Sequence, residues 1–134
     1  MPYLVTLILT LTAANRDQYL IDHFKYSDFA CKDGSKVFLV HPKILILTEV
    51  LRRVWDRPII ITSAYRTPQH NEDVGGSETS FHLVGEAIDF LLPKNDKFEF
   101  VDLCEKIFPF CIANIYRGYV HCDLGKRRHG WEDV

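Results

Sequence analysis

The chain has no long apolar run, no strong excess of one charge and no basic stripe. None of its apolar runs reaches eighteen residues, so we expect no segment that spans a membrane. The formal net charge is only -2 at pH 7, and the one basic run is Lys126-Arg127-Arg128 near the C-terminus, which we interpret as a solvated tail. A nucleic-acid partner is therefore not expected.

Cysteine is sparse and irregularly spaced. The four cysteines are Cys31, Cys104, Cys111 and Cys122. None of them forms a C-x-x-C pair, which argues against a zinc site built from cysteines. Their even number permits disulfides, but a chain of 134 residues can form a sufficient core without them. We expect free, partly buried thiols, with a disulfide pair as the alternative.

The length of 134 residues fits one domain, and no internal repeat or low-complexity linker divides the chain. Short β-branched runs alternate with amphipathic stretches, which predicts an α+β fold. We expect a small, mostly antiparallel sheet with flanking helices. We also expect the protein to act as a monomer.

The N-terminal stretch 3–11 has two interpretations. Alternate positions are apolar, which predicts a strand; they are Val5, Leu7, Leu9 and Leu11. With Ala13 and Ala14 the same stretch also resembles a short signal peptide, although no lysine or arginine precedes the apolar run. We favour a retained strand. We therefore divide the chain into an N-terminal segment, 1–22, and a domain, 23–134.

The remaining elements follow from periodicity and turn residues. Strands are predicted over 37–40, 59–62, 85–92, 112–116 and 119–123, with 117–118 as a tight hairpin link. Helices are predicted over 42–55, 67–74 (capped by Thr67 with Pro68 next) and 95–107, whereas 23–30 is predicted to be a loop. The apolar faces expected to lie inward are Leu45, Leu47, Val50, Leu51 and Val54 in the first helix, and Phe98, Val101, Leu103, Cys104 and Ile107 in the last.

An acidic residue within an apolar strand of the stretch 80–90, "SFHLVGEAIDF", indicates a functional site. Asp89 lies within an apolar strand, where a carboxylate is costly unless it is paired or binds a metal. His82 can reach the same ion if the chain turns at Gly85. His121, between apolar neighbours in "YVHCDLG", is the candidate for a third ligand. Two imidazoles and one carboxylate leave the fourth zinc position to water, which is the arrangement of a catalytic site.

These segments resemble a known family. "SFHLVGEAIDF" resembles the S-x-H-x-x-G-x-A-x-D signature of the zinc D-Ala-D-Ala metallopeptidases, the M15 peptidases. "SAYRTPQHN" with "VGG", "YVHCDLG" and "HFKYSDFACKDGS" resemble further segments of the small single-domain branch, in the same order. The resemblance extends over about 23–131. The signalling domain of hedgehog proteins is similar in fold and zinc ligation.

The resemblance implies one zinc ion bound by His82, Asp89 and His121. It implies that Arg66 binds a substrate carboxylate or the developing oxyanion, a task that suits a planar guanidinium. Ser80 is expected to make an outer hydrogen bond that supports a ligand histidine. The implied substrate is a peptidoglycan stem peptide, cut as by a D,D-carboxypeptidase or an endopeptidase. The implied place of action is the bacterial cell wall, whether the gene is bacterial or, as for an endolysin, from a phage.

One position departs from the family pattern. Several branches place an acid three residues before the last zinc histidine, where it acts as general base, and Gly118 occupies that position here. Asp123 is our candidate base, because residues 121 and 123 of a strand point to the same face. It could equally orient a zinc histidine. Weaker candidates are Glu78 and Glu86, followed by His70. Without a base, the domain would be a non-catalytic zinc module that serves in binding or as a phage structural component.

Overall fold

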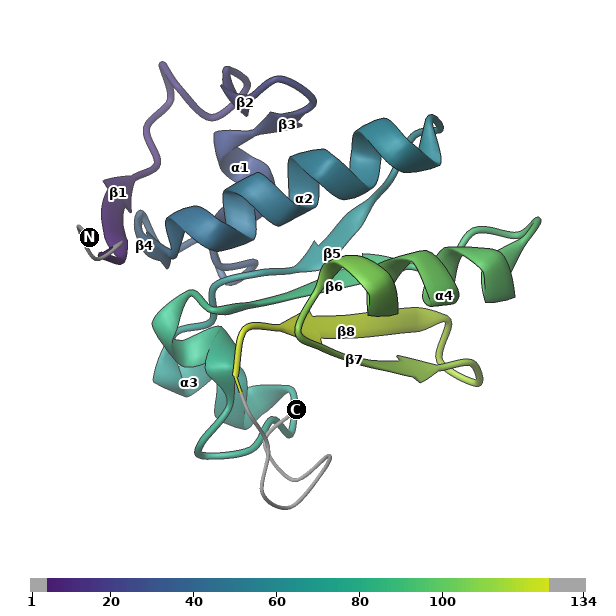
Figure 1. Cartoon of the computed structure of the whole chain (residues 1–134). Helices are drawn as coiled ribbons and strands as arrows, with labels where there is room; N and C mark the ends of the chain where they lie inside the picture. Colours follow the sequence, from purple (N-terminus) through teal and green to yellow (C-terminus); the bar gives the residue numbers. More distant parts are fainter. Residues whose placement is uncertain (1–4, 126–134) are drawn as a thin grey trace.

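The structure is a computed structural model that describes residues 5–125. The predicted basic tail and His129 lie outside these residues. The elements, in chain order, are β1 (Leu7–Thr10), β2 (Tyr19–Ile21), β3 (Phe24–Lys25), α1 (Tyr26–Phe29), β4 (Val37–Val40), α2 (Pro42–Trp55), β5 (Ile61–Ser63), α3 (Pro68–Asp73), the 3-10 helix η1 (Phe81–Val84), β6 (Ala87–Leu91), α4 (Lys97–Ile107), β7 (Phe110–Asn114) and β8 (Tyr119–Asp123) (Figure 1). Between residues 5 and 125, no helix has the length and apolar character needed to cross a bilayer.

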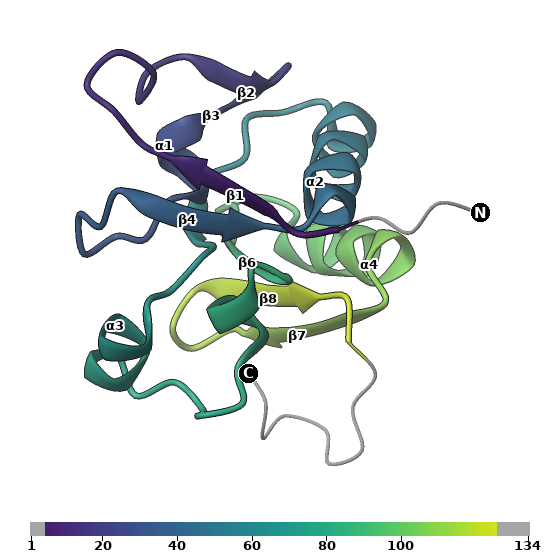
Figure 2. The ribbon, with the colours of Figure 1, turned by 90° about the vertical axis from the view of Figure 1, so that its left-hand side faces the viewer.

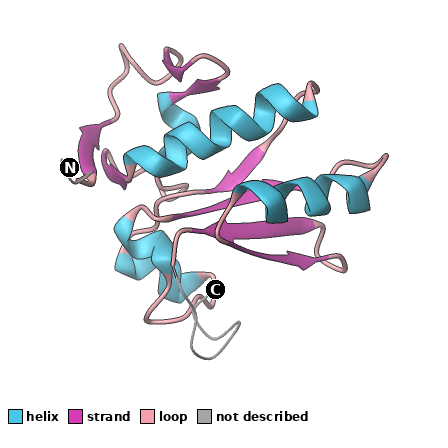
Figure 3. Ribbon diagram, viewed as in Figure 1, coloured by secondary structure: helices cyan, strands magenta, loops and turns pink. Residues whose placement is uncertain are grey.

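The principal sheet has four strands in the order β5-β6-β8-β7, and every neighbouring pair is antiparallel. Helices α2 and α4 lie together over this sheet, whereas α3 and η1 lie at one end of it (Figures 1 and 3). Two smaller antiparallel pairs, β1-β4 and β2-β3, complete the domain (Figure 2). The predicted α+β class is confirmed.

The two faces of the principal sheet differ in chemistry. Phe90 of β6 contacts the ring of Phe100 in α4, with centroids 6.2 Å apart, so this face of the strand packs against the helices. Val120 and Cys122 of β8 belong to the same apolar core. Because side chains alternate along a strand, the residues between them point to the opposite face. Asp89 and His121 occupy that second face.

The N-terminal strand is confirmed for Leu7–Thr10, which pairs with β4 in the register Leu7↔Val40 to Thr10↔Val37. The boundary between 1–22 and 23–134 stays a prediction. The loop predicted over 23–30 is wrong, because this stretch holds β3 and α1. Phe24 and Phe29 are both buried, with ring centroids 6.3 Å apart. Burial of these two rings in the common core orders a segment that has no clear periodicity of its own.

The helices form where predicted, but two apolar faces are partly wrong. Helix α2 buries Ile44, Leu45, Thr48 and Leu51, whereas Val50 and Val54 are exposed. In α4, Phe98 is 63% exposed and Phe100 is 1% exposed. Phe100, Cys104 and Phe108 form a buried stripe at a spacing of four residues, so Phe98 lies off the face that meets the sheet. Helix α3 begins as predicted, because the Thr67 side chain accepts a hydrogen bond from the backbone N–H of His70.

Strand boundaries shift by up to two residues in three places. The strand predicted over 85–92 is β6, Ala87–Leu91, because Gly85 ends the preceding helix. β5 spans Ile61–Ser63 rather than 59–62. β7 spans Phe110–Asn114 rather than 112–116, so the link to β8 has four residues, not two. The Asn114 side chain accepts a hydrogen bond from the backbone N–H of Arg117, and Gly118 adopts a left-handed φ of +80°. These local hydrogen bonds close the turn before the apolar pattern ends.

Candidate metal centre

His82 is positioned by the short helix η1, and the two flanking motif residues explain its geometry. The Ser80 hydroxyl accepts a hydrogen bond from the backbone N–H of His82 at 3.2 Å and so caps the helix. Gly85 ends the helix with a left-handed φ of +74°. A Cβ atom at this position would lie 2.5 Å from the carbonyl oxygen of Leu39 in β4. Only glycine therefore permits the turn that returns the chain into β6.

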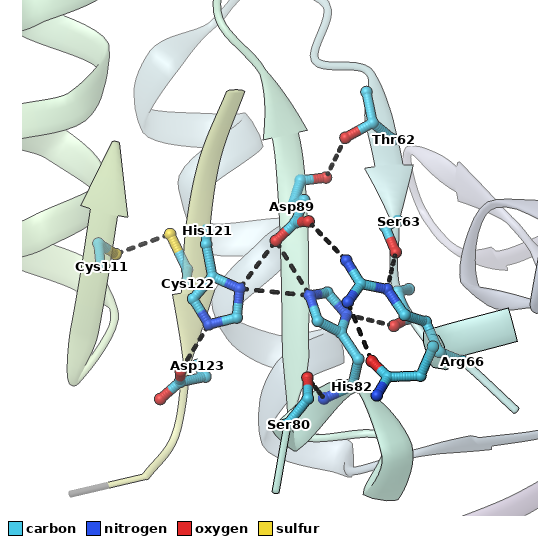
Figure 4. Close-up of polar contacts among 12 residues, drawn as sticks. Thr62, Ser63, Arg66, Ser80, His82, Asp89, Cys111, His121, Cys122 and Asp123 are labelled. Atoms are coloured by element: carbon cyan, nitrogen blue, oxygen red, sulfur yellow. Dashed lines mark hydrogen bonds and ion pairs between the residues drawn. The ribbon is translucent and has the colours of Figure 1, made fainter. Parts of the chain in front are cut away.

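Asp89 and His121 come from neighbouring strands. They are direct partners in the antiparallel register of β6 and β8, which places both side chains on one face and close together. Both are buried, as is His82. Figure 4 shows the three side chains meeting from η1, β6 and β8, with their polar atoms directed at one another.

The polar atoms of these residues meet in a compact triangle. His82 Nε2 lies 3.1 Å from Asp89 Oδ1, His121 Nδ1 lies 2.9 Å from the same oxygen, and the two nitrogens are 3.2 Å apart (Figure 4). A tetrahedral zinc ion with ligand distances of about 2.0–2.1 Å has neighbouring ligand atoms about 3.3 Å apart. The triangle therefore has the size of a zinc coordination sphere.

The outer hydrogen bonds determine what the inner nitrogens can do. His82 Nδ1 lies 2.5 Å from the carbonyl oxygen of Ala64, which can only accept, so this nitrogen carries the proton. His121 Nε2 lies 2.6 Å from Asp123 Oδ2 and donates to that carboxylate. Each neutral ring then turns a lone pair toward Asp89 Oδ1. Three acceptors without a hydrogen between them repel one another unless a cation lies among them, so the donor set fits zinc.

Burial and charge hold these groups in metal-binding forms. Burial lowers the pKa of His82, which favours the neutral imidazole that ligates metals. In the metal-free site burial alone would raise the pKa of Asp89, but the attraction of a protonated His82 and hydrogen bonds from protonated inner nitrogens of the two histidines outweigh it and lower that pKa; a metal ion takes the place of these protons. The carboxylate is therefore ionised at neutral pH. A deprotonated carboxylate and neutral imidazoles are the forms that metal binding requires.

Arg66 lies beside the triangle, behind Asp89. Its Nη2 lies 3.3 Å from Asp89 Oδ2, its Nε donates to the Ser63 hydroxyl at 3.1 Å, and its Nη1 donates to Asn71 Oδ1 at 3.2 Å (Figure 4). The side chain is 12% exposed. Arg66 thus lies next to the expected metal position, but its hydrogen bonds orient the Asp89 carboxylate and do not direct the guanidinium into open solvent.

The sequence interpretation missed three supporting groups. They are the carbonyl of Ala64, the hydroxyl of Ser63 and the side chain of Asn71. Gly76 belongs to the same support, because a Cβ there would lie 2.1 Å from Asn71 Oδ1. Asn71 and Gly76 stand in the quoted segments "SAYRTPQHN" and "VGG", which was the only available signal. Which backbone carbonyl meets a ring nitrogen depends on the fold and leaves no trace in the sequence.

The other predicted residues lie around the triangle in different ways. Asp123 is fully buried and faces the nitrogen of His121 that points away from His82 and Asp89. Of its two predicted roles, the geometry favours the partner that orients His121. Glu78 is exposed, Glu86 is half-buried, and His70 lies in α3 near Cys31.

All four cysteines are free, as expected. Cys122 lies in the core on the face opposite His121, and its sulfur is 2.7 Å from that of Cys111 (Figure 4).

Two imidazoles and one carboxylate, buried together in an α+β fold, form the donor set that is typical of a metalloprotein with a catalytic zinc site. Comparison with protein families matches residues 22–123 to Peptidase M15. The chain belongs to this family of zinc metallopeptidases, which confirms the resemblance found in its motifs. Comparison with curated proteins and with solved structures gives no match.

Proposed function

We propose that this protein hydrolyses a peptide bond in peptidoglycan stem peptides, at a bond that involves D-alanine, with one zinc ion held by His82 Nε2, Asp89 Oδ1 and His121 Nδ1. The observation that carries the proposal is the triangle of three acceptors, with sides of 2.9 to 3.2 Å. The substrate class rests on the family and on the likeness of the motifs to the D-Ala-D-Ala peptidases. A zinc ion held by these residues would lower the pKa of a bound water and polarise a carbonyl group.

Arg66 binds the terminal carboxylate of the substrate or stabilises the oxyanion. A guanidinium has five N–H donors. The contacts to Ser63, Asn71 and Asp89 use three of them, one on each nitrogen. The remaining N–H groups on Nη1 and Nη2 have no partner among residues 5–125, and one of them would donate to a substrate oxygen. Because Arg66 also holds Asp89, it links substrate binding to the geometry of the metal ligands.

Glu78 is the residue to which we assign proton transfer. The Asp123 carboxylate accepts a hydrogen bond from His121 Nε2, on the side of the ring away from Asp89, and Gly118 has no side chain. Glu78 lines a cavity of about 450 Å³ whose walls include Asn71 and Gly76, the two residues that pack against Arg66. None of the three zinc ligands lines this cavity, so Glu78 would have to move toward the zinc-bound water to take its proton and pass it to the leaving amine.

The second candidate is a non-catalytic zinc domain that binds wall peptides or serves as a phage structural module. The observation that favours it is the lack of an acid at Gly118 together with the engagement of Asp123 by His121. In that case zinc would be bound and peptides would be recognised, but no bond would be cut.

Turnover of defined peptides separates the two functions. Zinc-loaded protein should release D-alanine from a stem pentapeptide that ends in D-Ala-D-Ala, or cut a cross-linked dimer of such peptides. Chelation should abolish hydrolysis, and added zinc should restore it.

Glu78→Gln should lower kcat by roughly 10²–10⁴-fold with zinc retained. Glu72→Gln is the matched control, because Glu72 lines the same cavity. Binding of zinc and of peptide without any hydrolysis would support the non-catalytic domain.

A further inference from the structure

A second group of potential ligands lies outside the centre described above. Cys31 Sγ, a carboxylate oxygen of Asp33 and a ring nitrogen of His70 lie within 4.8 Å of one another. Cys31 and Asp33 follow α1, and His70 lies in α3. The fold thus brings together residues that share no motif spacing. This explains why the search for C-x-x-C pairs gave no sign of a metal site.

Cys31 is buried, and its sulfur is held by the backbone and the side chain of Thr67. It is 4% exposed, and its sulfur accepts a hydrogen bond from the backbone N–H of Thr67 at 3.5 Å. The thiolate, not the thiol, is the form that binds metals. An N–H group directed at the sulfur stabilises the negative charge of that form.

Asp33 is held with its carboxylate near this sulfur. Oδ1 accepts a hydrogen bond from the backbone N–H of Ser35 at 2.8 Å, and Oδ2 accepts one from the Thr67 hydroxyl at 2.8 Å. The Ser35 N–H is the main reason that the pKa of Asp33 is lowered. These two hydrogen bonds fix the carboxylate close to the Cys31 sulfur. The Thr67 hydroxyl also accepts from the backbone N–H of His70, so one side chain ties the three segments together.

His70 supplies a nitrogen. It is half-buried, and its imidazole makes no hydrogen bond to another residue within 5–125 that would occupy a ring nitrogen. A thiolate, an imidazole and a carboxylate form a mixed soft and borderline set. Zn²⁺ accepts this set, whereas Mg²⁺ and Ca²⁺ prefer oxygen ligands alone.

The geometry points to a second zinc site, formed by Cys31 Sγ, the Asp33 carboxylate and one ring nitrogen of His70, with water in the fourth position. The ion would join the turn after α1 to helix α3. Thr67 follows Arg66 directly, and Asn71, which contacts Arg66, follows His70. The second ion would therefore brace the segment that carries Arg66, while the first ion occupies the centre beside it.

Cobalt titration of the metal-depleted full-length protein tests this site. Thiolate ligation gives cobalt(II) an intense near-ultraviolet charge-transfer band, which imidazole and carboxylate ligands do not produce. We expect two equivalents of cobalt to bind, one of them with this band. Cys31→Ser should abolish the band and one equivalent, and His70→Gln should do the same without altering a buried residue. Cys104→Ser is the matched control, since Cys104 is buried but belongs to neither group.

The outcomes decide the second site independently of the first. A single equivalent without the charge-transfer band would overturn the second site and leave the central one intact. A band that survives in both Cys31→Ser and His70→Gln would place the thiolate elsewhere and also overturn it. Loss of the band with one equivalent retained would establish it, whether or not the protein hydrolyses peptides.

Discussion

The two groups of ligands in this protein differ in how firmly the fold prepares them. In the central group, all three residues are buried, and each ligand is held from behind: His82 by Ala64, His121 by Asp123 and Asp89 by Arg66. In the second group, Cys31 and Asp33 are held by Thr67 and Ser35, but Asp33 is exposed, and the ring of the half-buried His70 has no such partner within 5–125. Proximity alone makes both groups candidates, but outer hydrogen bonds are what fix ligand orientation and raise affinity. We therefore expect the central group to bind zinc more tightly.

The largest difference should appear between two matched variants, Asp89→Ala in the central group and Asp33→Ala in the second group. Asp89→Ala should remove the central metal and all hydrolysis, and it should leave the guanidinium of Arg66 without its anion. Removing one partner of a buried pair costs about 3–5 kcal/mol, which urea unfolding of the metal-free protein can measure. Asp33→Ala should leave the central zinc and hydrolysis in place. Equal losses in the two variants would contradict the comparison.

Gly76→Ala tests the contacts that hold Asn71 and Arg66 in place. In Gly76→Ala the new Cβ would lie 2.1 Å from Asn71 Oδ1 and 2.9 Å from Arg66 Nη1, so both side chains must move. We expect kcat/KM to fall by up to about 10²-fold, the cost of misplacing a catalytic group by about 1 Å, while zinc stays bound. Ser77→Ala is the control, because only the backbone carbonyl of Ser77 meets Asn71. A wild-type rate in Gly76→Ala would remove Arg66 from the proposed mechanism.

Asp123→Asn measures the value of an outer hydrogen bond at the central group. Because the charge beside His121 Nε2 is lost, zinc affinity should fall by about 10–100-fold. The rate at saturating zinc should stay close to that of the unchanged protein. Zinc competition against a coloured chelator, with rates taken in the same samples, measures both quantities. The reverse result, unchanged affinity with a large loss of rate, would return the role of general base to Asp123.

The smallest effect concerns the stability of the metal-free protein in acid. Asp33 and Asp89 both have lowered pKa values. A carboxyl group whose pKa is lower in the folded state stabilises that state above its unfolded pKa of about 3.9. This contribution is lost as the pH falls through the lower, folded pKa. The difference in unfolding free energy between the unchanged protein and Asp89→Asn should therefore be constant above about pH 5 and shrink below about pH 4. Asp33→Asn should show the same trend with a smaller amplitude, because Asp33 is exposed. A difference that grows with acid would contradict the sign.

The sequence could predict the parts of this molecule that depend on local pattern. The spacing of His82, Gly85 and Asp89 reflects a short helix, a left-handed turn and a strand, so it identified three points of the site directly. The contacts that complete the site join distant segments: Asn71 to Arg66, Ala64 to His82, and Cys31 to His70. The inward position of Phe100 in place of Phe98 has the same origin, since the sheet decides which helical face is covered.

The most direct test of the central claim is the position of zinc in a crystal of the active protein. Anomalous diffraction at the zinc absorption edge locates the ion without reference to any assumed ligand. The account predicts a strong peak at about 2.0–2.2 Å from His82 Nε2, Asp89 Oδ1 and His121 Nδ1. An active, zinc-loaded crystal with no peak among these three atoms would contradict it.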